Sequence, residues 1–300
     1  MVAPPPRLRL LAVVGVVGIS FSAIFVRLAD ESFSTTAFFR VAYALPVLGL
    51  LAWRRRRDDQ RSRRERALAL LAGVFLGIDF AFWHRAIAQI GAGLATVLGN
   101  TQVVFVALAA WWLLGERPAR RALIALPLVL GGVVLISGLG DRRAYGSDPW
   151  SGVVYGILTG VTYAAFLLLF RRSNRRAAPA VGPLFEATFA AAVTSLLIGF
   201  ADGGLELVPS WPSHGWLVTF ALVSQCVGWL LISRALPRLP ALETSILLLL
   251  QPLLTVLWGR LLFAEQLAAV QWLGVATVIA GIGWISLGGA VEKPALKVKS

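Results

Sequence analysis

Two stretches of the sequence align with each other without a gap: RAIAQIGAGLATVLGNTQVVFVALAAWWLLGERP at residues 85–118 and RALPRLPALETSILLLLQPLLTVLWGRLLFAEQL at residues 234–267. Equivalent positions carry identical polar residues: Arg85 and Arg234, Gln102 and Gln251, Glu116 and Glu265. The chain therefore contains an internal duplication. We assign residues 1–145 to a first repeat, residues 146–290 to a second repeat and residues 291–300 to a short tail.

The composition indicates an integral membrane protein. Hydrophobic residues make up 58% of the chain and charged residues 14%, with a mean hydropathy of +0.77, whereas soluble domains are about half apolar and about a quarter charged. Ten apolar segments are close to the roughly 20 residues that a helix needs to cross the hydrocarbon core. They are residues 8–28, 33–53, 67–89, 93–114, 121–139, 150–170, 180–200, 213–236, 240–262 and 269–289. We therefore predict an all-α integral membrane protein with ten transmembrane helices.

Lysine and arginine lie mainly at one set of span ends, as the positive-inside rule requires of cytoplasmic loops. This set comprises Arg7, Arg9, the arginines between 54 and 66, Arg117, Arg120, Arg121, Arg171, Arg172, Arg175, Arg176, Arg234, Arg238 and the lysines of the tail. The opposite ends hold Arg27, Arg85, Arg142, Arg143 and Arg260. We therefore place both termini in the cytoplasm, so that the two five-helix repeats are inverted relative to each other. This topology accounts for most of the net charge of +13, and we expect no nucleic-acid partner.

Inverted repeats in a membrane are typical of secondary transporters. Here each repeat has polar residues in the middle of a helix, Asn100-Thr101-Gln102 or Gln251-Pro252, followed by LLGERP or LLFAEQL. This arrangement resembles the paired EamA domains of the drug/metabolite transporter superfamily, and more narrowly its bacterial aromatic amino acid exporters. The resemblance covers about residues 8–290. It implies a carrier with a central cavity between the repeats, which moves small organic solutes, commonly outward, across the bacterial inner membrane.

Asp79 is a carboxylate near the middle of the third span. An ionised side chain at that depth costs about 3 kcal/mol on insertion scales, so function is the usual reason for its presence. Phe82 and Trp83 share its helix face, at i+3 and i+4. We interpret Asp79 as a group that binds a substrate amine or carries a proton, with structural pairing to another helix as the alternative. His84 lies farther round the helix and is expected at the interface.

Other polar and aromatic residues are candidates for the same cavity. They are Thr96, Asn100 and Gln102 in the fourth span, Tyr163 in the sixth, Gln225 and Trp229 in the eighth, and Ser245 and Gln251 in the ninth. Pro252 frees a backbone carbonyl one turn earlier, which persists only where it faces protein or water. The first repeat has Val103 at the equivalent position, so the sequence does not decide whether its helix is also broken. Interhelical hydrogen bonding is an equally ordinary explanation for the polar residues.

Three further patterns predict structure rather than substrate binding. Arg40 aligns with Glu186, and we interpret both as gate or interface residues that do not touch each other. Glu116 and Glu265 follow their helices and are expected to bind backbone amides or arginines. Small residues four apart predict close helix contacts, in the series Ala69, Gly73, Gly77 and the series Gly152, Gly156, Gly160.

These features predict a secondary transporter that exports amino acids, preferring aromatic and other apolar ones, by alternating access. The alternative on the same fold is an exporter of drugs or organic cations, which Asp79 with Phe82 and Trp83 would suit. The spans contain no lysine, which disfavours phosphorylated cargo. An enzyme is not expected, because two distant histidines and one cysteine form no catalytic cluster. The sequence has no phosphate-binding loop motif, so we expect no cofactor, and protons are the candidate coupling ion.

Overall fold

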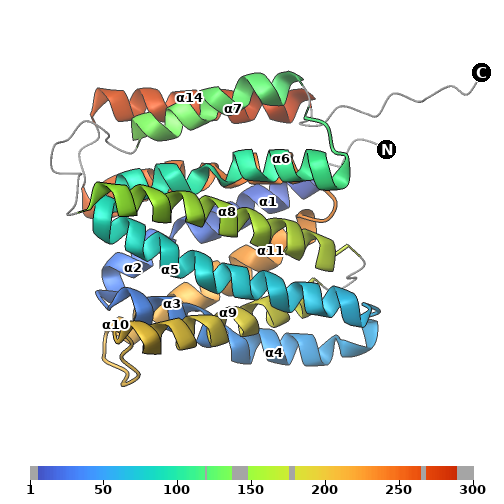
Figure 1. Cartoon of the computed structure of the whole chain (residues 1–300), viewed down its shortest axis with the longest axis vertical. Coiled ribbons are helices and arrows are strands. Elements are labelled where there is room, and N and C mark those ends of the chain that lie inside the picture. The colour runs from blue at the N-terminus through green and yellow to red at the C-terminus, as the bar shows by residue number, and fades with distance from the viewer. Residues whose placement is uncertain (1–5, 119, 137–147, 176–179, 265–267, 289–300) are drawn as a thin grey trace, which may run out of the picture.

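The computed structural model describes residues 6–118, 120–136, 148–175, 180–264 and 268–288, which form a stack of helices running roughly along one direction (Figure 1). The elements are α1 (Pro6–Ser20), α2 (Ser22–Ala29), α3 (Phe33–Ala42), α4 (Leu45–Arg54), η1 (Arg56–Asp58), α5 (Arg63–Asn100), α6 (Gln102–Leu114), α7 (Arg120–Ile136), α8 (Pro149–Ser173), α9 (Val181–Asp202), α10 (Ser213–Phe220), the π-helix η3 (Ala221–Gly228), α11 (Trp229–Ala235), α12 (Ala241–Leu248), α13 (Leu250–Phe263) and α14 (Ala269–Gly288). In the part of the chain that the structure describes, eight segments are long and apolar enough to cross a membrane, and two shorter apolar helices lie at Leu123–Leu135 and Ala269–Gly281. These ten segments coincide with the ten predicted spans, and the predicted all-α fold is confirmed.

The fourth and ninth spans, which are equivalent in the two repeats, are both broken near their middle. The ninth breaks at Leu249, between α12 and α13, and the fourth at Thr101, between α5 and α6. Pro252 explains the break in the ninth span, because a proline cannot donate to the carbonyl one turn earlier. The fourth span has no proline there, but the Thr101 hydroxyl donates to the carbonyl of Leu98 and competes with the helix ladder. The helix of the first repeat is therefore also broken, which its sequence did not decide.

Helix α5 contains more than one membrane span, although its residues are helical without interruption. The candidate spans are Arg63–Ile90 and Ala95–Leu114, the second of which continues into α6. A Cβ added to Gly99 would lie 3.9 Å from Cδ1 of Trp83, whereas a straight helix would separate these residues by about 24 Å. The chain therefore turns back between the two spans, as Figure 1 shows.

Glycines bring α5 close to its neighbours, as the small-residue series predicted. A Cβ on Gly73 would lie 2.1 Å from the carbonyl oxygen of Ala187 in α9, and one on Gly77 would lie 2.6 Å from Thr194 Cβ. On α8, Gly152, Gly156 and Gly160 lie against Ile90, Leu98 and Thr101 respectively. Helix α5 thus packs against α8 and α9 at distances that a side chain would prevent.

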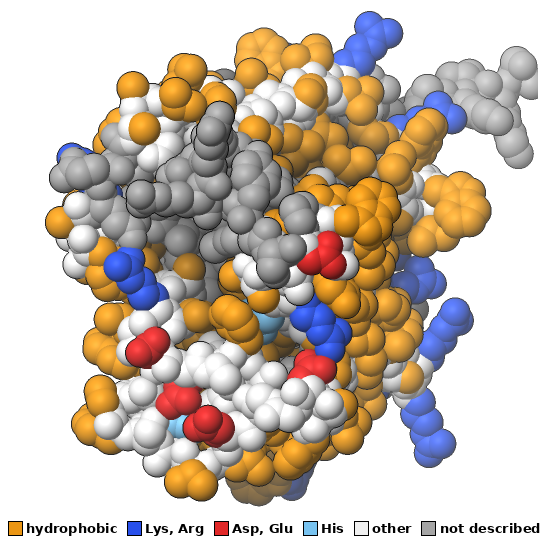
Figure 2. All heavy atoms as spheres, turned by 60° about the vertical axis from the view of Figure 1, so that its left-hand side comes forward, with side chains coloured by type: hydrophobic (Ala, Val, Ile, Leu, Met, Phe, Trp, Pro, Cys, Tyr) orange, Lys and Arg blue, Asp and Glu red, His pale blue; other side chains and the backbone are white. Residues whose placement is uncertain are grey.

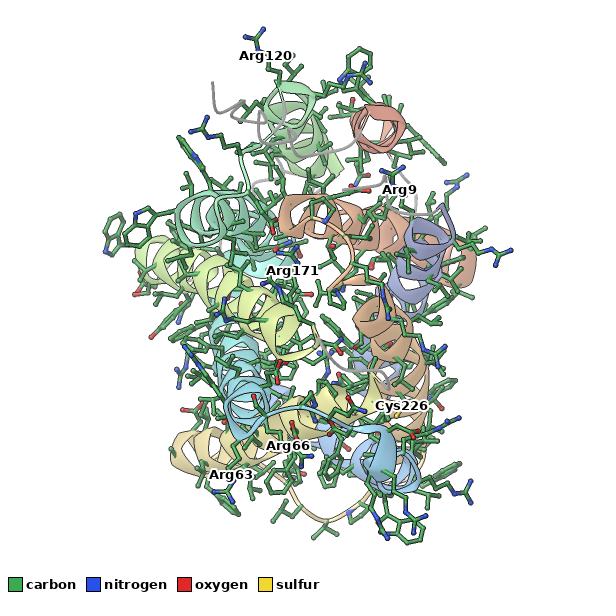
Figure 3. The ribbon with its side chains drawn as sticks, turned by 90° about the vertical axis from the view of Figure 1, so that its right-hand side faces the viewer. Arg9, Arg63, Arg66, Arg120, Arg171 and Cys226 are labelled. Carbon is green, nitrogen blue, oxygen red and sulfur yellow. The ribbon has the colours of Figure 1, made fainter. Side chains whose placement is uncertain are left out.

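Charged side chains distinguish the two ends of the bundle. Figure 3 looks onto an arginine-rich end, where Arg9, Arg63, Arg66, Arg120 and Arg171 lie. Helix α1 begins at this end (Figure 1). Figure 2 shows acidic side chains gathered at the opposite end. The loops that the charge pattern assigned to one side of the membrane therefore lie at one end of the structure.

Three ion pairs at the arginine-rich end join the first repeat to the second. They are Arg9–Glu243 at 2.6 Å, Glu116–Arg171 at 2.7 Å and Arg61–Glu186 at 2.7 Å. Glu116 also accepts a hydrogen bond from the backbone N–H of Ala241 at 3.1 Å, which confirms its predicted structural role, while Glu265 lies outside the described residues. At the opposite end Arg85 pairs with Asp202 at 2.6 Å, and both side chains are more exposed.

A buried arginine holds the basic loop before α5 against α9. The side chain of Arg61 is fully buried and donates to Asp59 through Nε and Nη2, each at 2.9 Å. Its Nη1 donates to Glu186 at 2.7 Å. Burial alone would raise the pKa of Asp59, but the hydrogen bonds and positive charge of Arg61 lower it overall. The loop therefore contains an ion pair whose strength depends on pH.

This pair predicts how stability responds to acid. Because the pKa of Asp59 is lower in the folded than in the unfolded protein, the pair stabilises the fold at neutral pH and loses this contribution as pH falls through the folded pKa. In detergent, we expect the melting temperature of the wild type to fall more steeply below about pH 4 than that of Asp59→Asn. Asp58→Asn is the control, since Asp58 pairs with Arg55 at 3.6 Å in an exposed position. Parallel curves for wild type and Asp59→Asn would contradict the prediction.

The contact between α5 and α9 can be tested with one methyl group. Gly73→Ala forces that methyl against the Ala187 carbonyl, and we expect a loss of about 1–3 kcal/mol, the usual cost of overpacking. Gly131→Ala is the matched control, because a Cβ at Gly131 in α7 meets nothing within 4 Å. Its melting temperature should equal or exceed that of the wild type, since alanine is the better helix former. Equal melting temperatures for the two variants would contradict the close packing of α5 against α9.

Candidate functional site

The predicted carboxylate lies inside the bundle among residues from three helices. Asp79 of α5 is only 6% exposed. The positive charge of Arg40 in α3 acts on its carboxylate. Thr162 of α8 lies beside it, with its hydroxyl donating to the carbonyl of Leu158 in its own helix at 2.8 Å. Tyr163 of α8 is electrostatically coupled to both charged groups. We call Arg40, Asp79, Thr162 and Tyr163 the central cluster.

Arg40 lies in the central cluster, and its role as a gate residue stays a prediction. Its guanidinium carbon lies 4.3 Å from the ring centroid of Phe80 and 4.4 Å from that of Phe220. Its Nε is buried without a hydrogen-bond partner. The expectation that Arg40 does not contact Glu186 agrees with the structure, where Glu186 binds Arg61. The interpretation of Arg40 as an interface residue is wrong, because α5 and α10 enclose its side chain with aromatic rings.

The aromatic residues predicted beside Asp79 lie farther along α5, toward the acidic end. The ring of Phe82 stacks on that of Tyr155 in α8, with centroids 6.0 Å apart. Trp83 lies against Gly99. The rings that contact Arg40 are those of Phe80 and Phe220, which the sequence does not distinguish from ordinary apolar packing.

His84 is covered by neighbouring helices, and its position at the membrane interface stays a prediction. The imidazole is 8% exposed and stacks on Phe33 of α3, with centroids 4.8 Å apart. It lines a cavity of about 160 Å³ near the acidic end, together with Arg85 of α5 and Asp202 of α9. The side chain is covered because α3 and α9 pack over this end of α5.

A hydrogen bond between the repeats joins the polar residues of the fourth span to the ninth. Gln102 Nε2 donates to the backbone carbonyl of Ser245 at 3.5 Å, and Gln102 Oε1 is buried without a partner. The Ser245 hydroxyl donates to a carbonyl in its own helix. Asn100 likewise donates to the carbonyl of Thr96 at 2.8 Å, while Gln251 is half-buried. Interhelical bonding therefore explains Gln102, and intrahelical bonding explains Asn100.

The candidates of the eighth span lie in or next to the π-helix η3. Gln225 donates through Nε2 to the Thr188 hydroxyl at 3.0 Å, and its Oε1 is buried without a partner. Trp229 packs edge-to-face on Phe166, with centroids 5.1 Å apart. Tyr163 stacks on the same phenylalanine at 5.8 Å. A row of rings therefore leads from the central cluster to Trp229, beside a π-helix of the kind frequent at functional sites.

Thr162 was not among the predicted site residues, although the repeat contained a signal for it. The segment GVTYAAFL, which starts at Gly160, is the counterpart of GISFSAIF, which starts at Gly18, so Thr162 corresponds to Ser20. Ser20 also makes contacts in the bundle interior, where its hydroxyl accepts a hydrogen bond from Trp258 Nε1 at 2.8 Å. Both repeats thus place a hydroxyl residue at this position.

The described residues contain no group of three or more His, Cys, Asp or Glu side chains that could hold a metal ion. At the arginine-rich end a wide recess of about 790 Å³ lies between α4, α9 and α11 and is lined partly by Arg55, Arg57 and Arg234. Buried polar atoms without a partner include the Arg40 Nε and Asp79 Oδ1 of the central cluster and the amide oxygens of Gln102 and Gln225.

Comparisons with known proteins agree on the architecture. The model of the EamA-like transporter family matches residues 8–138 and 150–287, once in each repeat. An uncharacterized transporter of Archaeoglobus fulgidus is 27% identical, over 73% of this chain and 76% of its own. The uncharacterized transporter YwfM of Bacillus subtilis is 25% identical, over 89% of this chain and 90% of its own. The uncharacterized protein PA1977 of Pseudomonas aeruginosa is 28% identical, over 94% of this chain and 95% of its own.

The fold is also that of a known crystal structure. This structure superposes with a TM-score of 0.78 at 16% sequence identity, and the match covers 94% of this chain and 97% of that chain. At such low identity the likeness concerns the arrangement of helices and not the residues of a site.

The coupling between Arg40 and Asp79 can be measured by a double-mutant cycle. We expect Asp79→Asn and Arg40→Gln each to lower the free energy of unfolding in mixed micelles, because each leaves an opposite charge without compensation. The double variant should be less destabilised than the sum, with a coupling of about 1 kcal/mol or more. The control cycle uses the more exposed pair Arg85 and Asp202, where the coupling should stay below about 1 kcal/mol. Additive effects at Arg40 and Asp79 would contradict a shared cluster.

Proposed function

The chain belongs to the EamA-like transporter family, and on this premise we propose that it exports amino acids across the bacterial inner membrane by alternating access. Aromatic and other apolar amino acids are the preferred substrates. The observation that supports this most directly is Asp79, a carboxylate buried in the bundle interior with its Oδ1 lacking a partner. Such a group is suited to receive a substrate ammonium, and intramembrane carboxylates commonly serve this purpose.

The apolar part of the substrate has a matching environment. Tyr163, Phe166 and Trp229 form a continuous row of rings that begins at the central cluster. Aromatic faces attract both apolar side chains and cations. This combination favours amino acids with large apolar side chains.

Alternating access requires contacts between the repeats that can open at one end at a time. The ion pairs at the arginine-rich end, which we assign to the cytoplasm by the positive-inside rule, each connect one repeat to the other. The pair between Arg85 and Asp202 connects the repeats at the opposite end. These pairs are the contacts that opening of each end would break.

An exporter of organic cations or drugs is the second candidate. The same observation favours it, since a carboxylate with an unpartnered oxygen beside aromatic rings would also hold an amine without a carboxylate. Transport of decarboxylated amines in place of amino acids would support it.

Protons are the proposed coupling ion, with Asp79 as the group that carries them. Protonation of Asp79 would remove the negative charge that acts on its neighbours Arg40 and Tyr163. The test is uptake of radiolabelled amino acids into proteoliposomes, with and without a pH gradient. We expect saturable uptake of apolar amino acids that the gradient accelerates. Saturable uptake of none of the common amino acids would overturn the proposed function.

Asp79→Asn tests the role of the carboxylate directly. We expect the variant to insert and elute as a monodisperse peak, while its uptake no longer responds to the pH gradient. Asp148→Asn is the matched control, because Asp148 is an exposed N-cap of α8 and asparagine caps as well as aspartate. An undiminished response to the gradient in Asp79→Asn would exclude this residue as the proton carrier.

A further inference from the structure

We infer that Arg40 is the carboxylate-binding residue of the substrate site, so that the substrate is a zwitterion held between Arg40 and Asp79. This inference rests on the proposed function, and it assigns a role to the second charged residue of the central cluster. It also decides between the two candidate substrate classes, since an organic cation has no group for Arg40.

The guanidinium of Arg40 is held in place without the use of its hydrogen-bond donors. Charged side chains inside a membrane protein normally pair with an opposite charge or with backbone carbonyls. Arg40 makes no hydrogen bond or salt bridge to any residue that the structure describes, and its Nε is buried without a partner. Its contacts are with the faces of Phe80 and Phe220. Stacking fixes the guanidinium plane and leaves its N–H groups for a planar anion such as a carboxylate.

Asp79 presents the complementary half of the same arrangement. Its Oδ1 is buried without a partner, and the hydroxyl of the neighbouring Thr162 donates to the carbonyl of Leu158 instead. Arg40 and Asp79 act on each other electrostatically, yet they do not close into a salt bridge. Each of the two charged groups has a buried polar atom without a hydrogen-bond partner, which is energetically costly. A ligand that pairs with both groups would remove this cost.

The net charge of the ligand follows from this arrangement. A cation bound at Asp79 would satisfy the carboxylate but bring a second positive charge near Arg40. An anion bound at Arg40 would do the reverse, and like charges are strongly unfavourable where water is scarce. A zwitterion places its carboxylate at Arg40 and its ammonium at Asp79, so that charges alternate and no net charge is added. An α-amino acid is the simplest molecule with this pattern.

The inference is tested by ligand-induced thermal stabilisation of the purified full-length protein in detergent, a measurement independent of transport. The probes are phenylalanine, tryptophan and leucine, each compared with the amine that lacks its carboxylate: phenethylamine, tryptamine and isoamylamine. Phenylpropionate, which lacks the amine, completes the set. For the wild type we expect at least one of the amino acids to stabilise the protein at concentrations about tenfold to a hundredfold lower than its amine, the gain typical of a charge-assisted hydrogen bond.

Variants of Arg40 show whether this residue supplies the discrimination. Arg40→Gln should bind the amino acid and its amine equally, and Arg40→Lys should retain part of the preference, because a lysine keeps the charge but loses the planar fork. Arg260→Gln is the matched control, since Arg260 also lies over an aromatic ring, that of Trp272 at 5.8 Å, but is exposed. It should keep the wild-type preference.

The possible failures are distinguishable. Equal binding of amino acid and amine by the wild type, or an unchanged preference in folded Arg40→Gln, would overturn the role of Arg40 while amino acid uptake in proteoliposomes could still stand. Stabilisation by none of the three amino acids would also overturn it. A third result is a carboxylate preference that depends on Arg40 in a protein that takes up no amino acid. This result would overturn the proposed export of amino acids, while the assignment of the zwitterion site would still hold.

Discussion

The cost of placing a charge or an unpaired backbone group in hydrocarbon governs this structure. It sends nearly all arginines to the helix ends, where Arg9, Arg61, Arg85 and Arg171 pair across the repeats. It also requires that each break in a helix face protein, as at Thr101 and Leu249. Arg40 and Asp79 are charged residues that lie within the spans, away from these ends. Their position at the centre is the reason to regard the central cluster as the site.

The two repeats are alike as scaffolds and different in chemistry. Both break their fourth helix near the same position, and both place a hydroxyl residue, Ser20 or Thr162, in the interior. The residue of the second repeat that corresponds to Asp79 is Gly228, where a Cβ would lie 2.8 Å from Ile19. That position is used for the close approach of α1 and cannot hold a side chain. The same position therefore contributes a carboxylate in one repeat and a helix contact in the other.

Packing and site are connected through the helices that the glycines bring together. Gly73 and Gly77 place α5 against α9, and Gly160 places α8 against the break at Thr101. These contacts hold Asp79 opposite Thr162 and Tyr163. A carrier must shift such helices without exposing the cluster to lipid. Smooth glycine surfaces suit this requirement, because they offer close contact with few interlocking side chains.

The sequence by itself determined the number of spans, the inverted repeats and the structural role of Glu116, because hydropathy, charge at the span ends and internal alignment are local properties of the chain. It also identified Asp79, since an ionisable residue in the middle of an apolar span is visible without a structure. The surroundings of Asp79 were decided only by tertiary structure. Arg40, Phe80 and Phe220 come from three different helices, and His84 is covered by α3 and α9. Helical periodicity gives the face on which a residue lies, but which helix covers that face depends on packing between segments far apart in the chain.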